Sequence, residues 1–158
     1  MATVTLHPSS ASDPAALQAV IMAIESSGNP FALRFEPAVY AGDVAPSVAA
    51  RIATLHGADY ETGRVIAATS WGLFQIMGFN LWAGPHAYAG TLYEFCADTI
   101  AQRLAFETFL ADRGMNFTLA ELLGNANKLI AFAAAYNGDG IRYARAMRES
   151  AAALGYSS

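Results

Sequence analysis

The chain has 158 residues, enough for one domain with a sizeable core; 54% of them are hydrophobic and only 14% charged, which excludes a disordered protein. The net charge is −4 with no basic run, so the positive face that a nucleic-acid-binding protein needs is not expected. No apolar stretch approaches the ~20 residues that cross a bilayer, so no membrane insertion is expected.

The first predicted element is a helix that begins at Asp13-Pro14, because Asp is a good N-cap and Pro suits the first helical position. Its buried face is marked by apolar residues at helical spacing: Leu17, Val20, Ile21 and Ile24. Gly28 and Pro30 end it. Residues 1–11 are expected to form an N-terminal arm.

The middle of the chain is less regular. Residues 31–45 are expected to form an irregular hairpin or an extended loop, and the wider 31–66 stretch a small lobe. A helix is predicted at about 47–55, and the polar sequence at 56–68 indicates a loop. A short apolar segment closed by Gly78 follows at 69–78.

The second half is predicted to be helical. Residues 91–114 indicate one long helix, with Thr91 and Glu94 as a capping box and Gly114 as its stop. Three more helices are expected at about 118–124, 126–136 and 140–154. With abundant Ala and few β-branched residues, the chain is expected to be mainly α, with residues 12–158 forming a single domain.

Glu25 stands at the C-terminal end of the first predicted helix, beside the buried Ile24. An exposed carboxylate at a fraying helix end is the ordinary interpretation. However, the unpaired carbonyls of a last helical turn and the edge of the core both favour a protonated acid, and so raise the pKa of a carboxyl group. A general acid that works near neutral pH needs such a raised pKa.

Three sequence blocks stand out along the chain: Glu-Ser-Ser-Gly-Asn-Pro at 25–30, Ser-Trp-Gly-Leu-Phe-Gln-Ile-Met at 70–77 and Ala-Tyr-Asn-Gly at 135–138. In this order they are similar to the three blocks of the lysozyme superfamily. The chain resembles the soluble lytic transglycosylases and the phage N-acetylmuramidases over about 25–156. The resemblance implies a lysozyme-like catalytic domain with a cleft between the 13–27 helix and the 69–78 and 126–138 segments.

The resemblance also implies roles for individual residues. Glu25 would protonate the glycosidic oxygen between N-acetylmuramic acid and N-acetylglucosamine, and Gln75 would line the cleft beside it. Ser70 would orient sugar or water, Tyr136 would hold the catalytic carboxyl, and Asn137 would shape the same wall. Tyr136 as an ordinary core aromatic, and Asn137 as part of a turn, are the structural alternatives.

The 50 positions between Glu25 and Gln75 exceed the compact spacing of typical transglycosylases. The 35–66 insertion must therefore fold over or beside the cleft, and it carries four carboxylates: Glu36, Asp43, Asp59 and Glu61. A transglycosylase needs one carboxylate, because the 6-hydroxyl of the sugar attacks the anomeric carbon. A hydrolase usually needs a second one to hold water or stabilise the oxocarbenium charge.

Glu36 is the candidate second catalytic carboxylate, because it lies in an apolar setting between Phe35 and Pro37, in the segment that directly leaves the helix of Glu25. The alternative is a buried structural carboxylate. Its partner would be one of three arginines: Arg34, Arg51 or Arg64. Among the aromatic residues, Trp82 and Tyr88 are the best candidates for sugar contact.

The resulting hypothesis is a peptidoglycan-degrading glycosidase, either a free phage endolysin or a virion-associated lysin. The alternatives are a lytic transglycosylase, a chitinase or chitosanase, and a non-catalytic component of a phage tail. Peptidoglycan is the expected partner, with virion or tail proteins as further candidates. No cofactor or metal is expected, since Cys96 and three scattered histidines lack zinc-site spacing.

Residues 1–17 lack the basic and apolar regions of a signal peptide. We therefore expect synthesis in the host cytoplasm and access to the cell wall or periplasm by holin release or within a virion.

Overall fold

The computed structural model describes residues 4–6, 8–42 and 44–156. Its first half contains α1 (Pro14–Glu25), β1 (Leu33–Phe35), α2 (Pro37–Gly42), α3 (Pro46–His56), α4 (Tyr60–Ala67), β2 (Thr69–Trp71) and β3 (Ile76–Met77). The second half contains α5 (Gly78–Ala83), α6 (Leu92–Ala97), α7 (Thr99–Ala111), α8 (Leu119–Leu123), α9 (Ala126–Asn137) and α10 (Gly140–Ala153). The fold is therefore mainly helical, as predicted.

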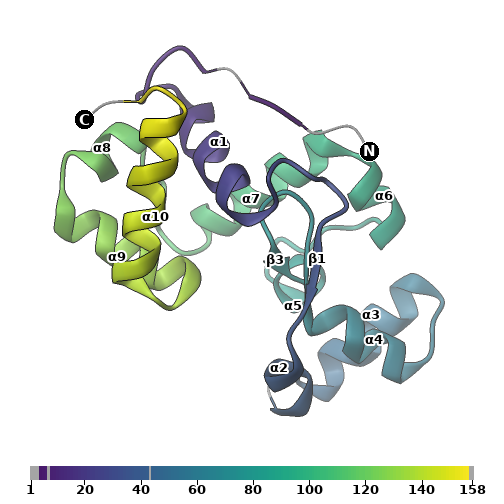
Figure 1. The fold of residues 1–158 in the computed structure, drawn as a ribbon. Helices are drawn as coiled ribbons and strands as arrows, with labels where there is room; N and C mark the ends of the chain where they lie inside the picture. The colour runs from purple at the N-terminus through teal and green to yellow at the C-terminus, as the bar shows by residue number, and fades with distance from the viewer. Residues whose placement is uncertain (1–3, 7, 43, 157–158) are drawn as a thin grey trace.

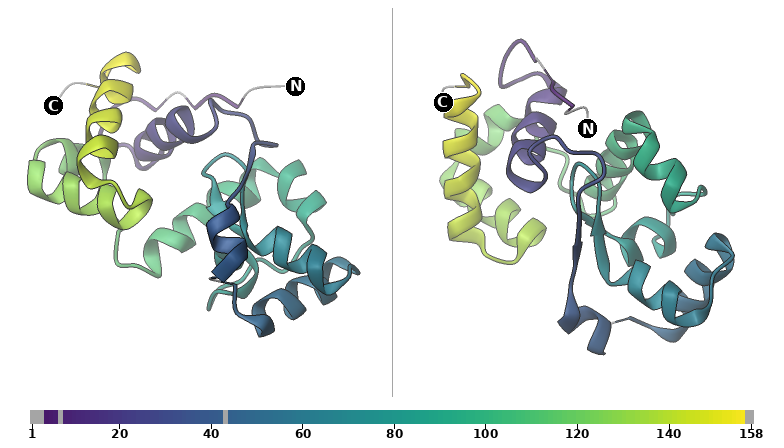
Figure 2. Two further views of the ribbon diagram at one scale, coloured as in Figure 1. Left: turned by 60° about the horizontal axis from the view of Figure 1, so that its bottom comes forward. Right: turned by 45° about the vertical axis from the view of Figure 1, so that its right-hand side comes forward.

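The elements form two groups (Figure 1). In one, α8, α9 and α10 pack together and against α1; in the other, α2–α5 lie beside the small sheet. α7 lies between the two groups, and the second set of views shows the same separation (Figure 2). No helix among the described residues is long and apolar enough to cross a membrane.

The sheet is antiparallel, with strand order β1-β2-β3. Arg34 pairs with Ser70, and Ser70 pairs with Met77, so these three side chains form one row across the sheet. The neighbouring row contains Trp71 and Ile76, which are both buried in the core. One face of the sheet thus contributes to the core and leaves the other available for a site.

The aromatic core links the β2–β3 turn to the other group of helices. Phe74 stacks on Phe106 of α7 at 4.2 Å between ring centroids, and Phe106 meets Tyr136 of α9 edge to face at 6.1 Å. Tyr136 in turn lies 5.7 Å from Tyr143 of α10. These rings fix the turn relative to α9 and α10 through rigid contacts rather than through a flexible loop.

The predicted start of α1 is confirmed: Asp13 accepts a hydrogen bond from the Ala15 N–H, with Pro14 at the first helical position. Of its predicted buried face, Leu17, Val20 and Ile21 are buried, whereas Ile24 is only partly so.

The helix at 46–56 confirms the prediction for 47–55, but the polar loop expected at 56–68 is wrong. α4 forms there because Asp59 caps it by accepting from the Thr62 N–H. Gly78 does not close the preceding segment but begins α5. A Cβ at Gly78 would lie 2.0 Å from the Ile66 carbonyl oxygen, so glycine allows α5 to pack closely on α4.

The long helix predicted at 91–114 is interrupted. Asp98 leaves the helical conformation and accepts hydrogen bonds from the Ile100 and Ala101 N–H groups, so α6 ends and α7 begins there. The capping box of Thr91 and Glu94 is confirmed. The helices predicted at 118–124, 126–136 and 140–154 are all present.

The expected N-terminal arm is described at residues 4–6 and 8–11, while residues 1–3 and 7 lie outside the described part. The Val4 N–H donates to the Gly28 carbonyl, and the Ala120 N–H of α8 donates to the Ala11 carbonyl. Val4, Leu6 and Ala11 also pack against the core. The arm therefore lies against the domain.

Candidate active site

The three sequence blocks meet at the turn of residues 72–75 between β2 and β3. Ser26, directly after α1, donates its hydroxyl to the Leu73 carbonyl at 2.8 Å. Tyr136 of α9 donates its hydroxyl to the Phe74 carbonyl at 2.7 Å. Blocks that are more than 40 positions apart in the sequence are therefore joined through the backbone of a single short turn.

Gln102 of α7 holds this turn from the core side. Its amide oxygen accepts from the Leu73 N–H at 2.7 Å, and its amide nitrogen donates to the carbonyls of Pro30, Phe95 and Cys96. The side chain has no exposed surface. Gly72 has φ +75° and a Cβ there would lie 2.3 Å from the Gln102 amide oxygen, so the turn requires glycine at this position.

Glu25 is the last residue of α1 and is partly buried. Tyr143 of α10 donates its hydroxyl to Glu25 Oε1 at 2.5 Å. Burial raises the pKa of Glu25, and the Tyr143 hydrogen bond and the positive charge of Arg34 oppose that rise only in part. Burial also raises the pKa of the Tyr143 phenol, which keeps it protonated and able to donate. Glu25 is therefore a fixed carboxyl with an increased tendency to hold a proton.

A groove of about 370 Å³ opens beside Glu25. Its lining includes residues from the three expected segments, namely the end of α1, the β2–β3 region and the end of α9. The β1–α2 connection, α5 and α7 also contribute, through Glu36, Asn80 and Phe109 among others. Glu25 thus faces the cleft from one group of elements and Glu36 from the other.

Glu36 forms an ion pair with Arg34, whose Nε lies 2.5 Å from Glu36 Oε1. The side chains keep 32% and 60% of their surface exposed, respectively. Of the three possible partners, Arg34 is the one found. The expectation of a buried structural pair is wrong in its burial, because Glu36 follows β1 directly and lines the groove together with Arg34.

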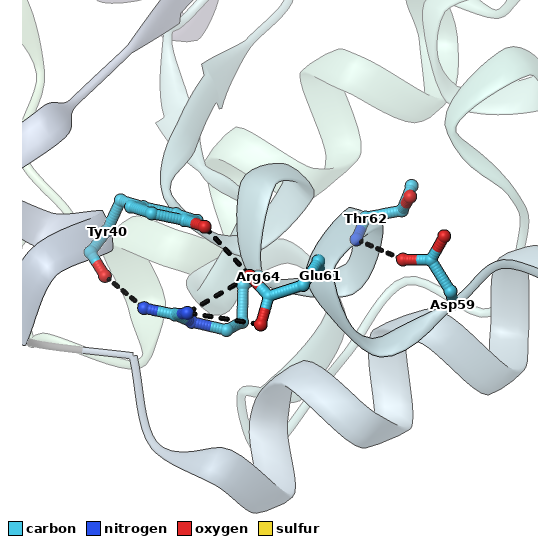
Figure 3. A network of polar contacts seen from close by, with 5 residues as sticks. All are labelled: Tyr40, Asp59, Glu61, Thr62 and Arg64. Carbon is cyan, nitrogen blue, oxygen red and sulfur yellow. Dashed lines mark hydrogen bonds and ion pairs between the residues drawn. The ribbon is translucent and has the colours of Figure 1, made fainter.

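The segment after Glu36 is anchored to α4 by a polar network (Figure 3). Tyr40 of α2 donates its hydroxyl to Glu61, and Arg64 donates to the Tyr40 carbonyl, both at 2.8 Å. Arg64 also pairs with Glu61 and lies over the Tyr40 ring at 4.2 Å. Since the Glu36 N–H donates to the Ala68 carbonyl, the chain is held on both sides of Glu36.

Of the other carboxylates of the insertion, the two that the structure describes, Asp59 and Glu61, do not line the groove. Asp59 caps α4, and hydrogen bonds from Thr62 lower its pKa. Glu61 belongs to the network with Tyr40 and Arg64. Asp43 lies outside the described residues. Among the carboxylates of the insertion that the structure describes, Glu36 is thus the one that lines the groove with Glu25.

Ser70, Gln75 and Asn137 all line the groove. Ser70 is 1% exposed, and its hydroxyl donates to Met77 Sδ, a weak acceptor, at 3.2 Å. Gln75 has φ +48° and donates to the Gly72 carbonyl at 3.0 Å. A positive φ is uncommon for glutamine, and such strain is concentrated at functional sites. The substrate contacts predicted for these three residues remain predictions.

Tyr136 lines the groove, but its hydroxyl donates to the Phe74 carbonyl and not to Glu25. The role that the resemblance gave to Tyr136, holding the carboxyl, is filled by Tyr143. Sequence reasoning missed Tyr143, although its position on the buried face of the last helix with Ala144, Met147 and Ala151 was a visible signal.

Trp82 does not fit the sugar contact predicted for it. Its side chain is 0% exposed, packs against Trp71 and Phe95, and donates its indole N–H to the Gly90 carbonyl at 2.9 Å. A tryptophan in the apolar segment of α5 is a core residue here.

Tyr88 lines a second, larger cavity of about 630 Å³, formed mainly by α5, the 84–89 segment and α7. This cavity shares Ile76, Asn80 and Phe109 with the groove beside Glu25, so the two are adjacent. Tyr88 thus lies beside the groove and not in its lining, and the sugar contact predicted for it remains a prediction.

Comparison with known proteins identifies the family. A sequence model described as N-acetylmuramidase matches residues 49–154. The chain belongs to the N-acetylmuramidase family. It is also 34% identical over 125 residues to the endolysin of Enterobacteria phage PRD1, an alignment that covers 75% of this chain and 83% of the relative. No solved structure matches the chain.

These findings confirm the resemblance to phage-type, lysozyme-like muramidases and make this chain an enzyme that acts on peptidoglycan. The family match begins after Glu25 and Glu36 and includes the β2–β3 turn, Tyr136 and Tyr143. The roles of the two carboxylates in the muramidase are therefore a matter of proposal.

Proposed function

We propose that this muramidase cleaves the β-1,4 bond between N-acetylmuramic acid and N-acetylglucosamine, with Glu25 as the general acid. The observation that carries the proposal is the hydrogen bond from Tyr143 to Glu25 at the side of the groove. It orients a carboxyl whose pKa is raised by burial, as protonation of a glycosidic oxygen requires.

Glu36 is proposed as the second carboxylate, because it lines the same groove from the opposite group of elements. In this hydrolytic mechanism Glu25 gives its proton to the leaving oxygen. Glu36 either activates a water or stabilises the positive charge at the anomeric carbon. Ser70, Gln75 and Asn137 would supply hydrogen bonds to the sugars, and the glycan would continue into the larger cavity beside Tyr88.

The first test is Glu25→Gln, which keeps the size of the side chain but removes the transferable proton. Turnover on purified murein should fall by about 10³-fold or more, since general acid catalysis contributes roughly 10²–10⁴-fold. Glu149→Gln on α10 is the matched control, because Glu149 is exposed and outside the groove. A Glu25→Gln enzyme with more than about a tenth of wild-type activity would assign the acid to another residue.

The transglycosylase is the alternative, since a single carboxylate beside a groove also suits it. Mass spectrometry of the released muropeptides separates the two reactions, because a 1,6-anhydro end lacks one water relative to a hydrolysed end. Reducing ends support the hydrolase with Glu36 as its second carboxylate. Anhydro ends together with an active Glu36→Gln enzyme would support the transglycosylase instead.

We further propose that the enzyme acts on the cell wall after release through a holin, or as part of a virion. Immunodetection in purified virions and in the host lysate would distinguish these routes. A non-catalytic tail component would be present in virions and would lack activity on murein.

A further inference from the structure

Arg34 is a cation placed directly at the catalytic groove. It lies in the sheet row with Ser70 and Met77, and all three line the groove with Glu25 and Glu36. Among the described residues of that lining, Arg34 is the only basic one. The chain as a whole has a net charge of −4, so the positive charge of Arg34 is opposite in sign to the net charge of the protein.

The guanidinium group of Arg34 is only partly used. Nε donates to Glu36, and within the described part of the chain the two terminal nitrogens have no hydrogen-bond partner. An arginine presents five N–H donors in a planar fork, and the pair of terminal nitrogens can bind one carboxylate through two bonds. With 60% of its surface exposed, the side chain can be reached by a ligand in the groove.

The ion pair with Glu36 does not explain the position of Arg34 by itself. An exposed pair of this kind contributes only about 0–1 kcal/mol to stability. Its geometry instead fixes the direction of the fork, because Glu36 is held through the Ala68 carbonyl and by the anchored α2 segment. Arg34 is thus pre-oriented while its outer edge stays available, which lowers the entropy cost of binding an anion.

We propose that Arg34 is a specificity-determining residue that binds a carboxylate carried by the substituent of the N-acetylmuramic acid unit. This inference rests on the proposed function, because it places the muramic sugar next to Glu25. In native murein the lactyl carboxyl is amide-linked to the peptide, so the carboxylate belongs to the peptide; where the peptide has been removed, it belongs to the lactyl group. Chitin-type glycans carry neither, so Arg34 would select muramic-acid strands against them.

The test compares wild type and Arg34→Gln on native murein and on murein whose carboxylates have been amidated. Amidation should lower the kcat/KM of the wild type about tenfold, the size expected for a partly exposed charge-assisted pair. Arg34→Gln should lose about tenfold on native murein and nothing further on the amidated form. Arg34→Lys, which keeps the charge without the fork, should fall between the two on native murein.

Arg145→Gln is the matched control, since it changes the net charge equally at an exposed position of α10 outside the groove. It should retain wild-type kcat/KM on both substrates. If the loss caused by Arg34→Gln is the same on native and amidated murein, Arg34 acts through Glu25 or Glu36 alone, and the proposal is overturned.

Amidase-treated strands, which have lost the peptide and carry a free lactyl carboxylate, identify the source of the anion. Dependence on Arg34 that disappears there restricts the contact to the carboxylates of the peptide, and dependence that persists shows that the freed lactyl carboxylate binds Arg34 in their place. Failure of the proposed function gives a different pattern, in which Glu25→Gln retains more than about a tenth of wild-type activity on native murein. An active wild type with an indifferent Arg34→Gln would refute only the carboxylate contact.

Discussion

Replacing Gln102 by Leu should destabilise the muramidase by roughly 3–9 kcal/mol, although Gln102 touches no groove residue of the proposed mechanism. The substitution keeps the approximate size of the side chain and removes its polar atoms. The substitution changes the hydrogen bonding of the β2–β3 turn, which contains Gln75. Carbonyl groups of this turn accept hydrogen bonds from the Ser26 and Tyr136 hydroxyls.

The magnitude follows from the groups that lose their partner. Phe95 keeps an acceptor bond from the Asp98 N–H at 3.4 Å. The Leu73 N–H and the carbonyls of Pro30 and Cys96 have no other hydrogen bond among the described residues, so all three would be left unpaired. Each unpaired buried group costs about 1–3 kcal/mol, which gives roughly 3–9 kcal/mol in total.

The chain contains a matched control in Gln18, which is 3% exposed and also bonded through both ends of its amide. Its partners are the side chains of Arg103 and Glu107, at 2.6 Å each. Long charged side chains near the surface can turn to water, whereas backbone groups in a turn cannot. Gln18→Leu should therefore cost about 1 kcal/mol, clearly less than Gln102→Leu.

Urea unfolding of the three proteins, followed by circular dichroism, measures both differences. Equal losses for the two substitutions, or a loss below ~1 kcal/mol for Gln102→Leu, would show that the backbone groups find new partners and would refute the reasoning.

Three further predictions concern the groove. Tyr143→Phe removes the hydrogen bond that favours the ionised carboxyl of Glu25, so the pKa of Glu25 should rise. The alkaline limb of the kcat/KM profile should then move to higher pH. An unmoved limb would show that Tyr143 does not act on the catalytic acid. Glu36→Gln breaks an exposed pair with Arg34 and should cost about 1 kcal/mol or less in thermal melts while abolishing turnover, and full activity would end its catalytic role. Because burial raises the pKa of Glu25, wild type should lose stability relative to Glu25→Gln as the pH rises. The loss should begin at the ordinary carboxyl pKa of about 4.3 and be complete above the pKa of Glu25 in the folded protein. Thermal melts of the two proteins that run parallel across about pH 3–8 would contradict this.

The sign of the last prediction follows from proton counting. Between the two pKa values the folded state holds a proton that the unfolded state has released, so raising the pH favours unfolding. Glutamine does not titrate, and its stability should not follow this trend.

The sequence predicted those elements whose signals are local. The Asp13-Pro14 start of α1 and the capping boxes at Thr91 and Thr118 lie within a few residues of the groups they bond, and all three are confirmed. The failures also have local causes. The helix predicted at 91–114 runs through Asp98, but a short acidic side chain can cap the next helix as easily as it can point to solvent.

The site was predicted less completely, because its contacts span long sequence separations. Three blocks in order placed Glu25, Ser70 and Gln75 on the groove. They could not show which of two tyrosines, seven residues apart on consecutive helices, reaches Glu25. They also could not show that Gln102 holds the turn, since a buried glutamine and an exposed one look alike in a helical pattern.

The two carboxylates of the groove are held in unlike ways, and this difference is the strongest physical argument for assigning them different tasks. Glu25 is enclosed at a helix end, bonded by a phenol, and has a raised pKa. Glu36 remains open to water in an ion pair with Arg34. Where two titratable groups meet one substrate from unlike surroundings, the enclosed one suits the acid and the solvated one suits the base or the stabilising charge. The 31–69 stretch that separates the first two sequence blocks therefore does more than extend the chain, because it brings Arg34 and Glu36 to the groove wall that α1 does not provide.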